Sequence, residues 1–179
     1  TLENDSALVA LGEAVYGAGQ GFSIVAYLTF STGVGGARIS SGKIDDTAYS
    51  FEPSKLLMDS HGAFRTLEDA ASGNGFMAQY GLPPKEVTGM EPWLEAARLS
   101  ARGVHTAVMF WSPDVIILGG PMIVGSPSIP YEEIEKEARF LLKEREGQLV
   151  LRKGTLDAFG GLWGALALLQ SKRAKSNIS

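Results

Sequence analysis

Residues 31–36 read Ser-Thr-Gly-Val-Gly-Gly, a composition that suits a turn whose backbone binds phosphate. If the chain bends back here, N–H groups and the Thr32 hydroxyl point at one spot, and the glycines let an anion come close. The segment is not a Walker A loop, because no Lys-Ser/Thr pair follows it. It is not a dinucleotide-binding fingerprint either, because a strand is expected after it. A glycine-rich hairpin without a ligand stays an open alternative.

A carboxylate, Asp5, stands beside Asn4 where a helix is expected to begin. The helix dipole and the N–H groups of the first turn stabilise a negative charge there, so Asp5 suits a role as an anion. A simple helix cap is the alternative. A second glycine pair, Gly119-Gly120, follows the aliphatic segment 114–118. This pair is a further candidate, because ligands of open α/β sheets lie beyond the carboxyl ends of strands.

The composition excludes several kinds of chemistry. The chain has 179 residues and no cysteine, which excludes disulfides, thiolate metal sites and a Cys nucleophile. The two histidines, His61 and His105, are far apart in the sequence and do not predict a metal site. The formal net charge is -4, with both signs interspersed, so no basic surface for nucleic acid is expected. Without a targeting segment or a long apolar run, we expect a cytoplasmic protein that binds no membrane.

The elements that would position these residues follow from the spacing of apolar side chains. Segment 92–111 is the clearest helix, and Thr66-Leu67-Glu68-Asp69 predicts a capping box that opens a short helix ending near Gly73. Antiparallel strands followed by βα units predict an α/β fold with a mixed sheet flanked by helices. The expected helices are 4–16, 66–73, 92–111, 131–145 and 159–172, and the expected strands are 22–30, 37–41, 48–51, 114–118 and 149–151, with 52–65 irregular.

Four motifs occur in a set order along nearly the whole chain. They are Asn-Asp-Ser-Ala-Leu-Val-Ala-Leu-Gly-Glu-Ala at 4–14 with Gly-Ala-Gly-Gln-Gly at 17–21, the turn at 31–36, Leu-Gly-Gly at 118–120, and Gly-Gly-Leu-Trp-Gly-Ala at 160–165. This order resembles the ROK family (repressors, open reading frames and kinases). The resemblance implies an actin-like ATPase (ribonuclease H-like) fold with two lobes and a cleft between them. Residues 1–179 would be one domain, the C-terminal lobe, with the N-terminal lobe absent.

The resemblance also implies a role for each matching residue. Asp5 would be the general base that takes the proton from a sugar hydroxyl, and Asn4 would hydrogen-bond the sugar. ATP with Mg²⁺ would be the cofactor, and phosphoryl transfer asks mainly for positioning and charge stabilisation. The other implied contacts are with phosphate at Thr32, Gly33 and Gly35, with adenosine at Gly119, Gly120, Gly160 and Gly161, and with sugar at Glu52, Lys55 and Glu68.

The chain departs from the family pattern in the region that would bind sugar. The family usually has Glu-x-Gly-His, a Cys-rich zinc loop and then Cys-Leu-Glu, whereas this chain has Glu-Pro-Ser-Lys at 52–55 and Thr-Leu-Glu at 66–68. Both glutamates are kept but the cysteines are gone, so we expect no structural zinc. Lys55 stands where the histidine would be, and a flexible ammonium cannot copy an oriented imidazole. Lys55 therefore bears on which sugar is bound and on whether the protein is active.

Three functions stay open from the sequence. The first is a kinase for a hexose or hexosamine, which the retained phosphate turn favours. Because its cleft lies between two lobes, we expect residues 1–179 alone to be inactive. The second is the sugar-sensing domain of a ROK-type transcriptional repressor, and the third is an inert relative, which only Lys55 supports. We also expect a homodimer, with helix 92–111 as one possible contact surface.

Overall fold

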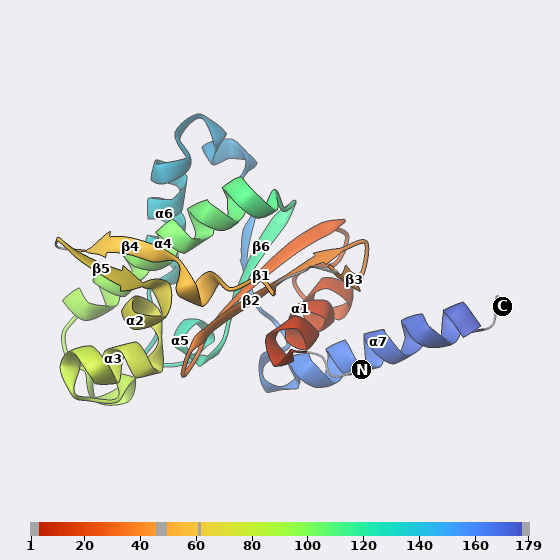
Figure 1. Cartoon of the computed structure of the whole chain (residues 1–179), viewed down its shortest axis with the longest axis horizontal. Coiled ribbons are helices and arrows are strands. Elements are labelled where there is room, and N and C mark those ends of the chain that lie inside the picture. The colour runs from red at the N-terminus through yellow and green to blue at the C-terminus, as the bar shows by residue number, and fades with distance from the viewer. Residues whose placement is uncertain (1–3, 46–49, 61, 177–179) are drawn as a thin grey trace.

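The computed structural model describes residues 4–45, 50–60 and 62–176, with the side chains of 144, 146 and 174–176 left aside. Within these residues, a mixed sheet of five strands forms the centre of the fold (Figure 1). The sheet pairs antiparallel on one side of its central strand and parallel on the other, which confirms the α/β fold expected from the sequence. The strand order is β3 (Lys43–Ile44), β2 (Val34–Ser40), β1 (Ile24–Phe30), β6 (Val115–Gly119) and β7 (Leu151–Lys153).

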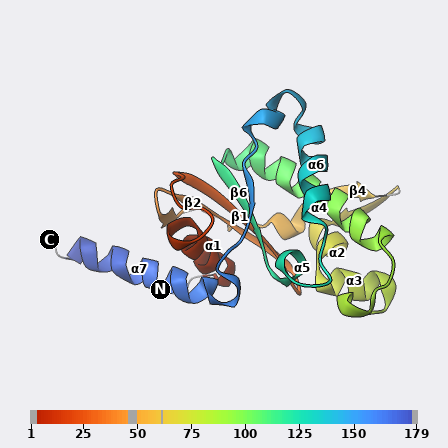
Figure 2. The ribbon, with the colours of Figure 1, turned by 180° about the vertical axis from the view of Figure 1, so that it is seen from behind.

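Alternating side chains of the central strand β1 divide the core between the two faces of the sheet. Leu28 and Phe30 are fully buried on one face, and Val25 and Tyr27 are buried on the other. On the first face, α6 packs beside α4 (Figure 2). The first face is covered by α2 (Leu67–Ala71), α3 (Gly73–Tyr80), α4 (Glu91–Trp111), α5 (Pro121–Val124) and α6 (Tyr131–Leu142), and the second by α1 (Asp5–Tyr16) and α7 (Gly160–Ser176).

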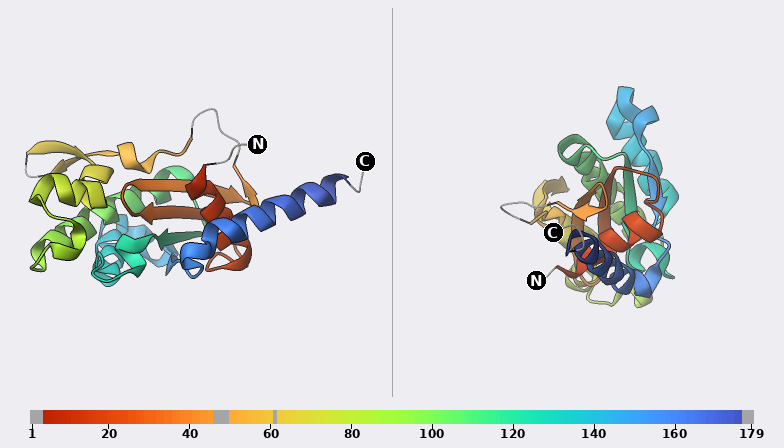
Figure 3. Two further views of the ribbon diagram at one scale, coloured as in Figure 1. Left: turned by 90° about the horizontal axis from the view of Figure 1, so that it is seen from below. Right: turned by 90° about the vertical axis from the view of Figure 1, so that its right-hand side faces the viewer.

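Glycines let α1 and α7 approach each other at the level of their backbones. A Cβ at Gly12 would overlap the carbonyl oxygen of Gly160, and a Cβ at Gly164 would overlap that of Leu8. Small residues at a helix crossing permit this closeness, and no larger side chain fits here. Beyond the crossing, α7 runs away from the sheet toward the C-terminus (Figure 3). None of the helices in the described ranges is long and apolar enough to cross a bilayer.

The third strand lies earlier in the chain than the predicted strand 48–51. β3 follows β2 after a two-residue turn, with Ser40 opposite Lys43. Ser41 and Gly42 both have positive φ angles, which is the conformation that reverses a chain within two residues. Ser50 and Phe51 have no regular structure, and residues 46–49 lie outside the described residues.

Segment 52–65 is not irregular, and this prediction was wrong. It contains a 3₁₀ turn, Pro53–Lys55, and a small hairpin of β4 (Leu57–Ser60) and β5 (Ala63–Thr66). His61, between the two strands, lies outside the described residues. The hairpin carries no clear apolar alternation, because Leu57 and Phe64 are exposed at its surface, so the usual pattern of a half-buried strand is missing.

A second helix, α3, begins at Gly73, where the sequence predicted an end. The capping box predicted at Thr66 is present, and it opens α2. Ser72 then caps α3, because its side chain accepts a hydrogen bond from the Gly75 N–H at 2.9 Å. A Cβ at Gly75 would overlap carbonyl oxygens of α2, so Gly75 allows the two helices to pack closely. Gly73, the predicted stop, is instead the first residue of α3. The predicted helices 92–111 and 159–172 match α4 and α7 to within a few residues, and α6 ends at Leu142, before a 3₁₀ segment, Lys143–Gln148.

Candidate active site

The start of α1 presents Asp5 at the protein surface. Asn4 caps the helix, since its Oδ1 accepts hydrogen bonds from the Ser6 N–H at 2.9 Å and the Ser6 hydroxyl at 2.6 Å. Asp5 Oδ1 also accepts from the Ser6 N–H, at 2.7 Å. Asp5 Oδ2 makes no hydrogen bond to any described residue. The helix end therefore holds an exposed carboxylate in a position where the dipole favours its charge.

Strand β2 passes directly beside this helix start. A Cβ at Gly35 would lie 3.2 Å from Ser6 Oγ, so only a glycine lets the strand come this close without displacing Ser6. Phe30 and Val34 are opposite each other in the ladder, which leaves residues 31–33 as the turn between β1 and β2. The structure thus brings the glycine-rich turn and the Asn4-Asp5 pair, predicted separately from the sequence, to neighbouring positions.

The carbonyl groups of the turn are used within the protein, whereas two of its N–H groups are not. The Gly33 carbonyl accepts from the Ser31 N–H at 2.8 Å. The Ser31 and Thr32 carbonyls accept from the first N–H groups of α3, those of Gly73 at 2.7 Å and Asn74 at 3.0 Å. The N–H groups of Thr32 and Gly33 donate to no acceptor in the described part of the chain. Such an arrangement leaves donors available for an anion, and phosphate binding by the turn stays a prediction.

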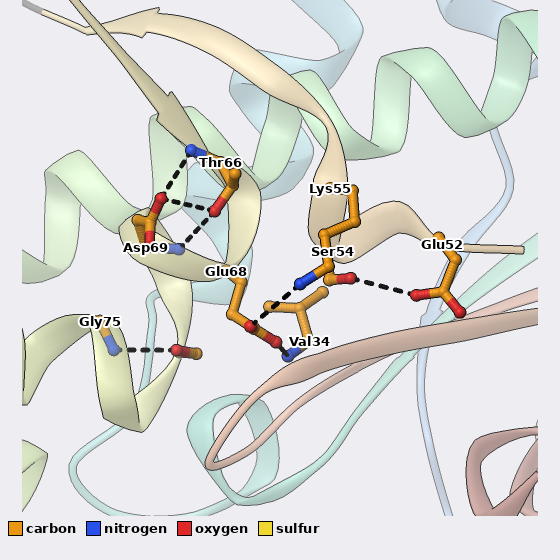
Figure 4. Close-up of polar contacts among 9 residues, drawn as sticks. Val34, Glu52, Ser54, Lys55, Thr66, Glu68, Asp69 and Gly75 are labelled. Atoms are coloured by element: carbon orange, nitrogen blue, oxygen red, sulfur yellow. Dashed lines mark hydrogen bonds and ion pairs between the residues drawn. The ribbon is translucent and has the colours of Figure 1, made fainter.

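Glu68 fastens the other side of the turn, and Figure 4 shows it beside Val34 and Lys55. Its Oε2 accepts a hydrogen bond from the Val34 N–H at 3.1 Å. A Cβ at Gly33 would lie 2.7 Å from the same oxygen, so glycine makes room for the carboxylate. Glu68 Oε1 lies 3.7 Å from Lys55 Nζ, which makes an ion pair in which the Lys55 side chain is 68% exposed.

The three residues expected to contact sugar flank the turn without forming one cluster. Lys55 and Glu68 are paired, as described above. Glu52 lies at the start of the 3₁₀ turn, where its Oε2 is 3.4 Å from Ser54 Oγ (Figure 4). This segment lies over β2, because a Cβ at Gly36 would be 2.8 Å from Pro53 Cγ. Among the described residues no group of three or more His, Cys, Asp or Glu side chains could hold a metal ion.

Gly119 and Gly120 line a pocket at the carboxyl end of β6. The pocket has a volume of about 460 Å³, which is within the usual range for small-molecule sites. A Cβ at Gly119 would overlap the Tyr27 ring, and Gly120 has φ +86° and lies against the Phe30 carbonyl, just before the turn. Both positions therefore need glycine. The lining also includes Glu13, Gly154, Asp157 and Ala158.

Glu13 is a residue of this pocket that the sequence analysis did not select. It is only 2% exposed, and its carboxylate accepts four hydrogen bonds. Those to Oε1 come from the N–H groups of Thr155 at 2.7 Å and Leu156 at 2.8 Å. Those to Oε2 come from the Ala18 N–H at 2.9 Å and the Thr155 hydroxyl at 3.2 Å. One signal was available, since Glu13 is the one charged residue in an otherwise small and apolar stretch, 7–15.

Tyr27 stands beside Glu13 in the pocket wall. Burial raises the pKa of the Tyr27 hydroxyl to about 12, a hydrogen bond with Thr29 opposes this, and the charge of Glu13 adds to it. The phenol is therefore neutral at ordinary pH and presents a flat, uncharged ring to the pocket.

Gly160 and Gly161 lie at the first turn of α7 and pack on α1. A Cβ at Gly160 would be 2.7 Å from Val9 Cγ1, and one at Gly161 would be 3.9 Å from Val9 Cγ2. The pocket reaches Asp157 and Ala158, a few residues before them. Gly160 thus has a structural use in bringing α7 close to α1, beside the nucleotide role expected for it.

The family model described as the ROK family matches residues 1–172. The chain belongs to the ROK family. Its fold is that of ROK sugar kinases, the actin-like ATPase fold, as expected. A ROK hexokinase from Thermus thermophilus superposes with a TM-score of 0.78 and 27% identity over 93% of this chain. A ROK family glucokinase from Streptomyces griseus, solved in complex with glucose and AMPPNP, has a TM-score of 0.74 and 22% identity, covering 94% of this chain and 67% of its own.

The family also contains regulators and longer chains. A ROK family transcriptional regulator, a homologue of the Escherichia coli MLC protein, has a TM-score of 0.76 and 19% identity, covering 94% of this chain and 51% of its own. An uncharacterized protein of Clostridium perfringens is 30% identical over 135 residues, 66% of this chain. The chain spans 65% of the Thermus hexokinase and 46% of the Clostridium protein.

Proposed function

We propose that the protein containing this chain transfers a phosphoryl group from ATP to a hydroxyl of a hexose or hexosamine. The observation that carries this proposal is the contact of Ser6 with Gly35, which sets Asp5 beside a turn with unused N–H groups. A base and a phosphate-binding turn are the two parts that phosphoryl transfer to an alcohol needs side by side. Because the chain spans about two thirds of the hexokinase, the proposal concerns the whole protein and not residues 1–179 alone, which we expect to be inactive.

Asp5 and Asn4 would act on the acceptor sugar. Asp5 Oδ2 would accept the proton of the attacking hydroxyl, which raises the nucleophilicity of the oxygen as the new bond forms. Since Asn4 Oδ1 already accepts from Ser6, its amide NH₂ remains to donate to a second sugar hydroxyl. Glu52, Lys55 and Glu68 are the further candidates for sugar contacts, and Lys55 is the one that would set this chain apart in substrate choice.

The turn and the pocket would hold the nucleotide. The N–H groups of Thr32 and Gly33 fit a phosphate, and the 460 Å³ pocket at Gly119 and Gly120 has the size and the flat Tyr27 wall that suit a nucleoside. When bound, ATP would supply the transferred group and Mg²⁺ would neutralise its phosphate charges. The glycines leave the space, and the backbone supplies the donors.

The test is phosphorylation of a panel of hexoses and hexosamines by the full-length protein, with ATP and Mg²⁺, beside Asp5→Asn. We expect turnover on at least one sugar and a loss of about a hundredfold to ten-thousandfold in kcat for the variant. Sugar binding should persist, because Asn keeps the size of Asp. Glu132→Gln, at an 82% exposed side chain on α6, is the control and should match the wild type. Full activity of Asp5→Asn would disprove the assignment of the base.

A sugar sensor is the second candidate, favoured by the similarity to the transcriptional regulator. A sensor would bind sugar in the same assay without consuming ATP. A catalytically inert relative, used for binding or assembly, would likewise phosphorylate no sugar in this assay. The expected homodimer also stays a prediction, which light scattering of the purified protein tests. Trp93 of the helix considered as its surface is buried in the core and cannot take part.

A further inference from the structure

The two carboxylate oxygens of Glu68 contact different parts of the molecule. One oxygen accepts the Val34 N–H at 3.1 Å, directly after the phosphate turn, and the other lies 3.7 Å from Lys55 Nζ (Figure 4). Lys55 ends the 3₁₀ turn that begins beside Glu52. The same side chain therefore touches the element expected to bind phosphate and the segment expected to bind sugar.

The position of Glu68 is fixed by the way α2 begins. Thr66 and Asp69 form a capping box, in which the Thr66 N–H donates to Asp69 Oδ2 at 2.9 Å and the Asp69 N–H donates to Thr66 Oγ1 at 3.1 Å (Figure 4). Leu67 is fully buried. The helix start is thus held on both sides of Glu68, whose side chain is 34% exposed. A carboxylate placed in this way is prepositioned to anchor a neighbouring loop.

Hydrogen bonds hold the turn from two sides. On one side, α3 donates its Gly73 and Asn74 N–H groups to the Ser31 and Thr32 carbonyls. On the other, Glu68 accepts the Val34 N–H. Together these contacts use the carbonyls of the turn and leave the Thr32 and Gly33 N–H groups without an acceptor among the described residues. Without Glu68, one of the two anchors that set this arrangement is lost.

A carboxylate beside an anion-binding turn also has an electrostatic cost. Glu68 Oε2 lies so close to Gly33 that a Cβ there would be 2.7 Å away, and its charge would repel a bound phosphate. Lys55 lies at ion-pair distance from the other oxygen and offsets this charge. The pair is exposed enough that its own contribution to stability is small. The ion pair matters instead because Lys55 reduces the repulsion between Glu68 and a neighbouring anion.

We propose that Glu68 is a positioning residue for the phosphate turn, which anchors Val34 and depends on Lys55 to neutralise its charge. This inference rests on the proposed function, in which the turn binds phosphate. It assigns Glu68 a role toward the nucleotide in addition to the sugar contact expected for it. It also gives Lys55 a reason to be lysine, since a neutral histidine at this place would not offset the carboxylate.

The test is the affinity for Mg²⁺-ATP without sugar, measured by calorimetry on the full-length protein. Glu68→Gln keeps an acceptor for Val34 and removes the charge, so its Kd should stay within about twofold of the wild type. Glu68→Ala loses the anchor and Lys55→Met leaves the charge unbalanced, so each should weaken binding about fivefold to tenfold. The double variant Glu68→Gln/Lys55→Met should recover most of the loss seen in Lys55→Met.

A matched pair elsewhere provides the control. Glu132 and Lys153 are also 3.7 Å apart at the surface, and Glu132→Ala should leave ATP affinity unchanged. Amide exchange checks the anchor itself: the Val34 N–H should exchange faster in Glu68→Ala, while the Leu28 N–H in the central strand keeps its wild-type rate and shows that the protein is folded.

The outcomes separate this inference from the function on which it rests. A wild-type protein that binds no Mg²⁺-ATP would overturn the proposed function. A wild type that binds ATP, with equal affinity in Glu68→Ala and Glu68→Gln, would leave the function standing and overturn the role given to Glu68. Weaker binding of sugar alone, with ATP affinity unchanged in all variants, would show that Glu68 is only a sugar ligand.

Discussion

Glu13 and Glu68 each fasten a loop beside the candidate site, but one lies in the core and the other at the surface. Glu13 is 2% exposed and accepts four hydrogen bonds, three of them from backbone N–H groups. Glu68 accepts one backbone N–H and faces an exposed lysine. A buried carboxylate with every lone pair used makes a fixed joint, whereas a partly exposed one with a single backbone donor makes a weaker joint.

The two joints serve different parts of the site. Glu13 holds the segment at Thr155 and Leu156 next to the pocket at Gly119, so this wall is set before any ligand arrives. Glu68 holds the end of the turn that would meet the transferred phosphate. We infer that recognition of the nucleoside part depends on a rigid wall, and that adjustment to phosphate and sugar is confined to the region of Glu68 and Lys55.

The largest expected effect comes from breaking the buried joint. Glu13→Ala removes the acceptor of four donors in a dry environment, so the free energy of unfolding should fall by about 3 kcal/mol or more. Urea denaturation followed by circular dichroism measures this. The exposed control Glu132→Ala should change it by at most about 0.5 kcal/mol. A loss as small as that in Glu13→Ala would mean that water replaces the carboxylate and that the joint is not rigid.

The next effect is a loss of stability at alkaline pH, and it concerns Tyr27, which shares the pocket wall with Glu13. Its folded pKa of about 12 lies above the ordinary value of 10.0. A raised pKa means stability that is fully present below pH 10 and is lost as the pH rises toward 12, by about 2–3 kcal/mol in total. Burial also raises the pKa of Tyr131 to about 12, so absorbance titration of the phenolates should show one late-ionising tyrosine fewer in Tyr27→Phe than in the wild type. Ionisation near pH 10 would show an open, hydrated wall.

Breaking the surface joint should affect stability less. Glu68→Ala loses one hydrogen bond at a partly exposed site, so we expect a fall of about 1 kcal/mol in the free energy of unfolding. Lys55→Met should change it by no more than about 0.5 kcal/mol. The same urea experiment applies. A Glu68→Ala loss equal to that of Glu13→Ala would erase the distinction between the two joints.

The smallest effect is a loss of stability at acidic pH. It tests the capping box at the start of α2, which positions Glu68. Hydrogen bonds from the Thr66 hydroxyl and N–H lower the pKa of Asp69 below its ordinary value. A lowered pKa means stability that is present above the ordinary value and is lost as the pH falls through the folded one. Asp69→Asn should therefore lower Tm slightly at pH 7 and by less at an acidic pH below the ordinary pKa. An equal difference at both values would show that the charge of Asp69 plays no part.

The sequence predicted the mixed sheet because its strands and long helices carry strong periodic signals. The buried run at Val115–Gly119 and the apolar stripe of Glu91–Trp111 are visible in the sequence without any tertiary knowledge. The hairpin at 57–66 was missed because large side chains such as Phe64 point to solvent there. α3 was missed because Gly73 suggested a helix stop, whereas it is the first residue of α3 and donates its N–H to the distant Ser31 carbonyl, which no local pattern reveals.

The motifs of the candidate site are visible in the sequence, whereas the contacts that connect them are not. Asp5, the turn at 31–36 and Gly119-Gly120 are recognisable from residue type and order. Glu13 was not selected, because its donors Thr155 and Leu156 are more than a hundred residues away in sequence. The bonds from Gly73 and Asn74 to the turn are also long-range. Such partners become visible only when the fold brings distant segments together.

The glycine crossing of α1 and α7 has a mechanical consequence. At Gly12 and Gly164 the two backbones touch without side chains between them, so we expect that one helix cannot slide past the other. We expect α1 and α7 to behave as one rigid unit. Because α7 extends beyond the sheet (Figure 3), we expect a force on that extension to reach the start of α1. The orientation of Asp5, the proposed base, would then depend on any contact that the extended part of α7 makes.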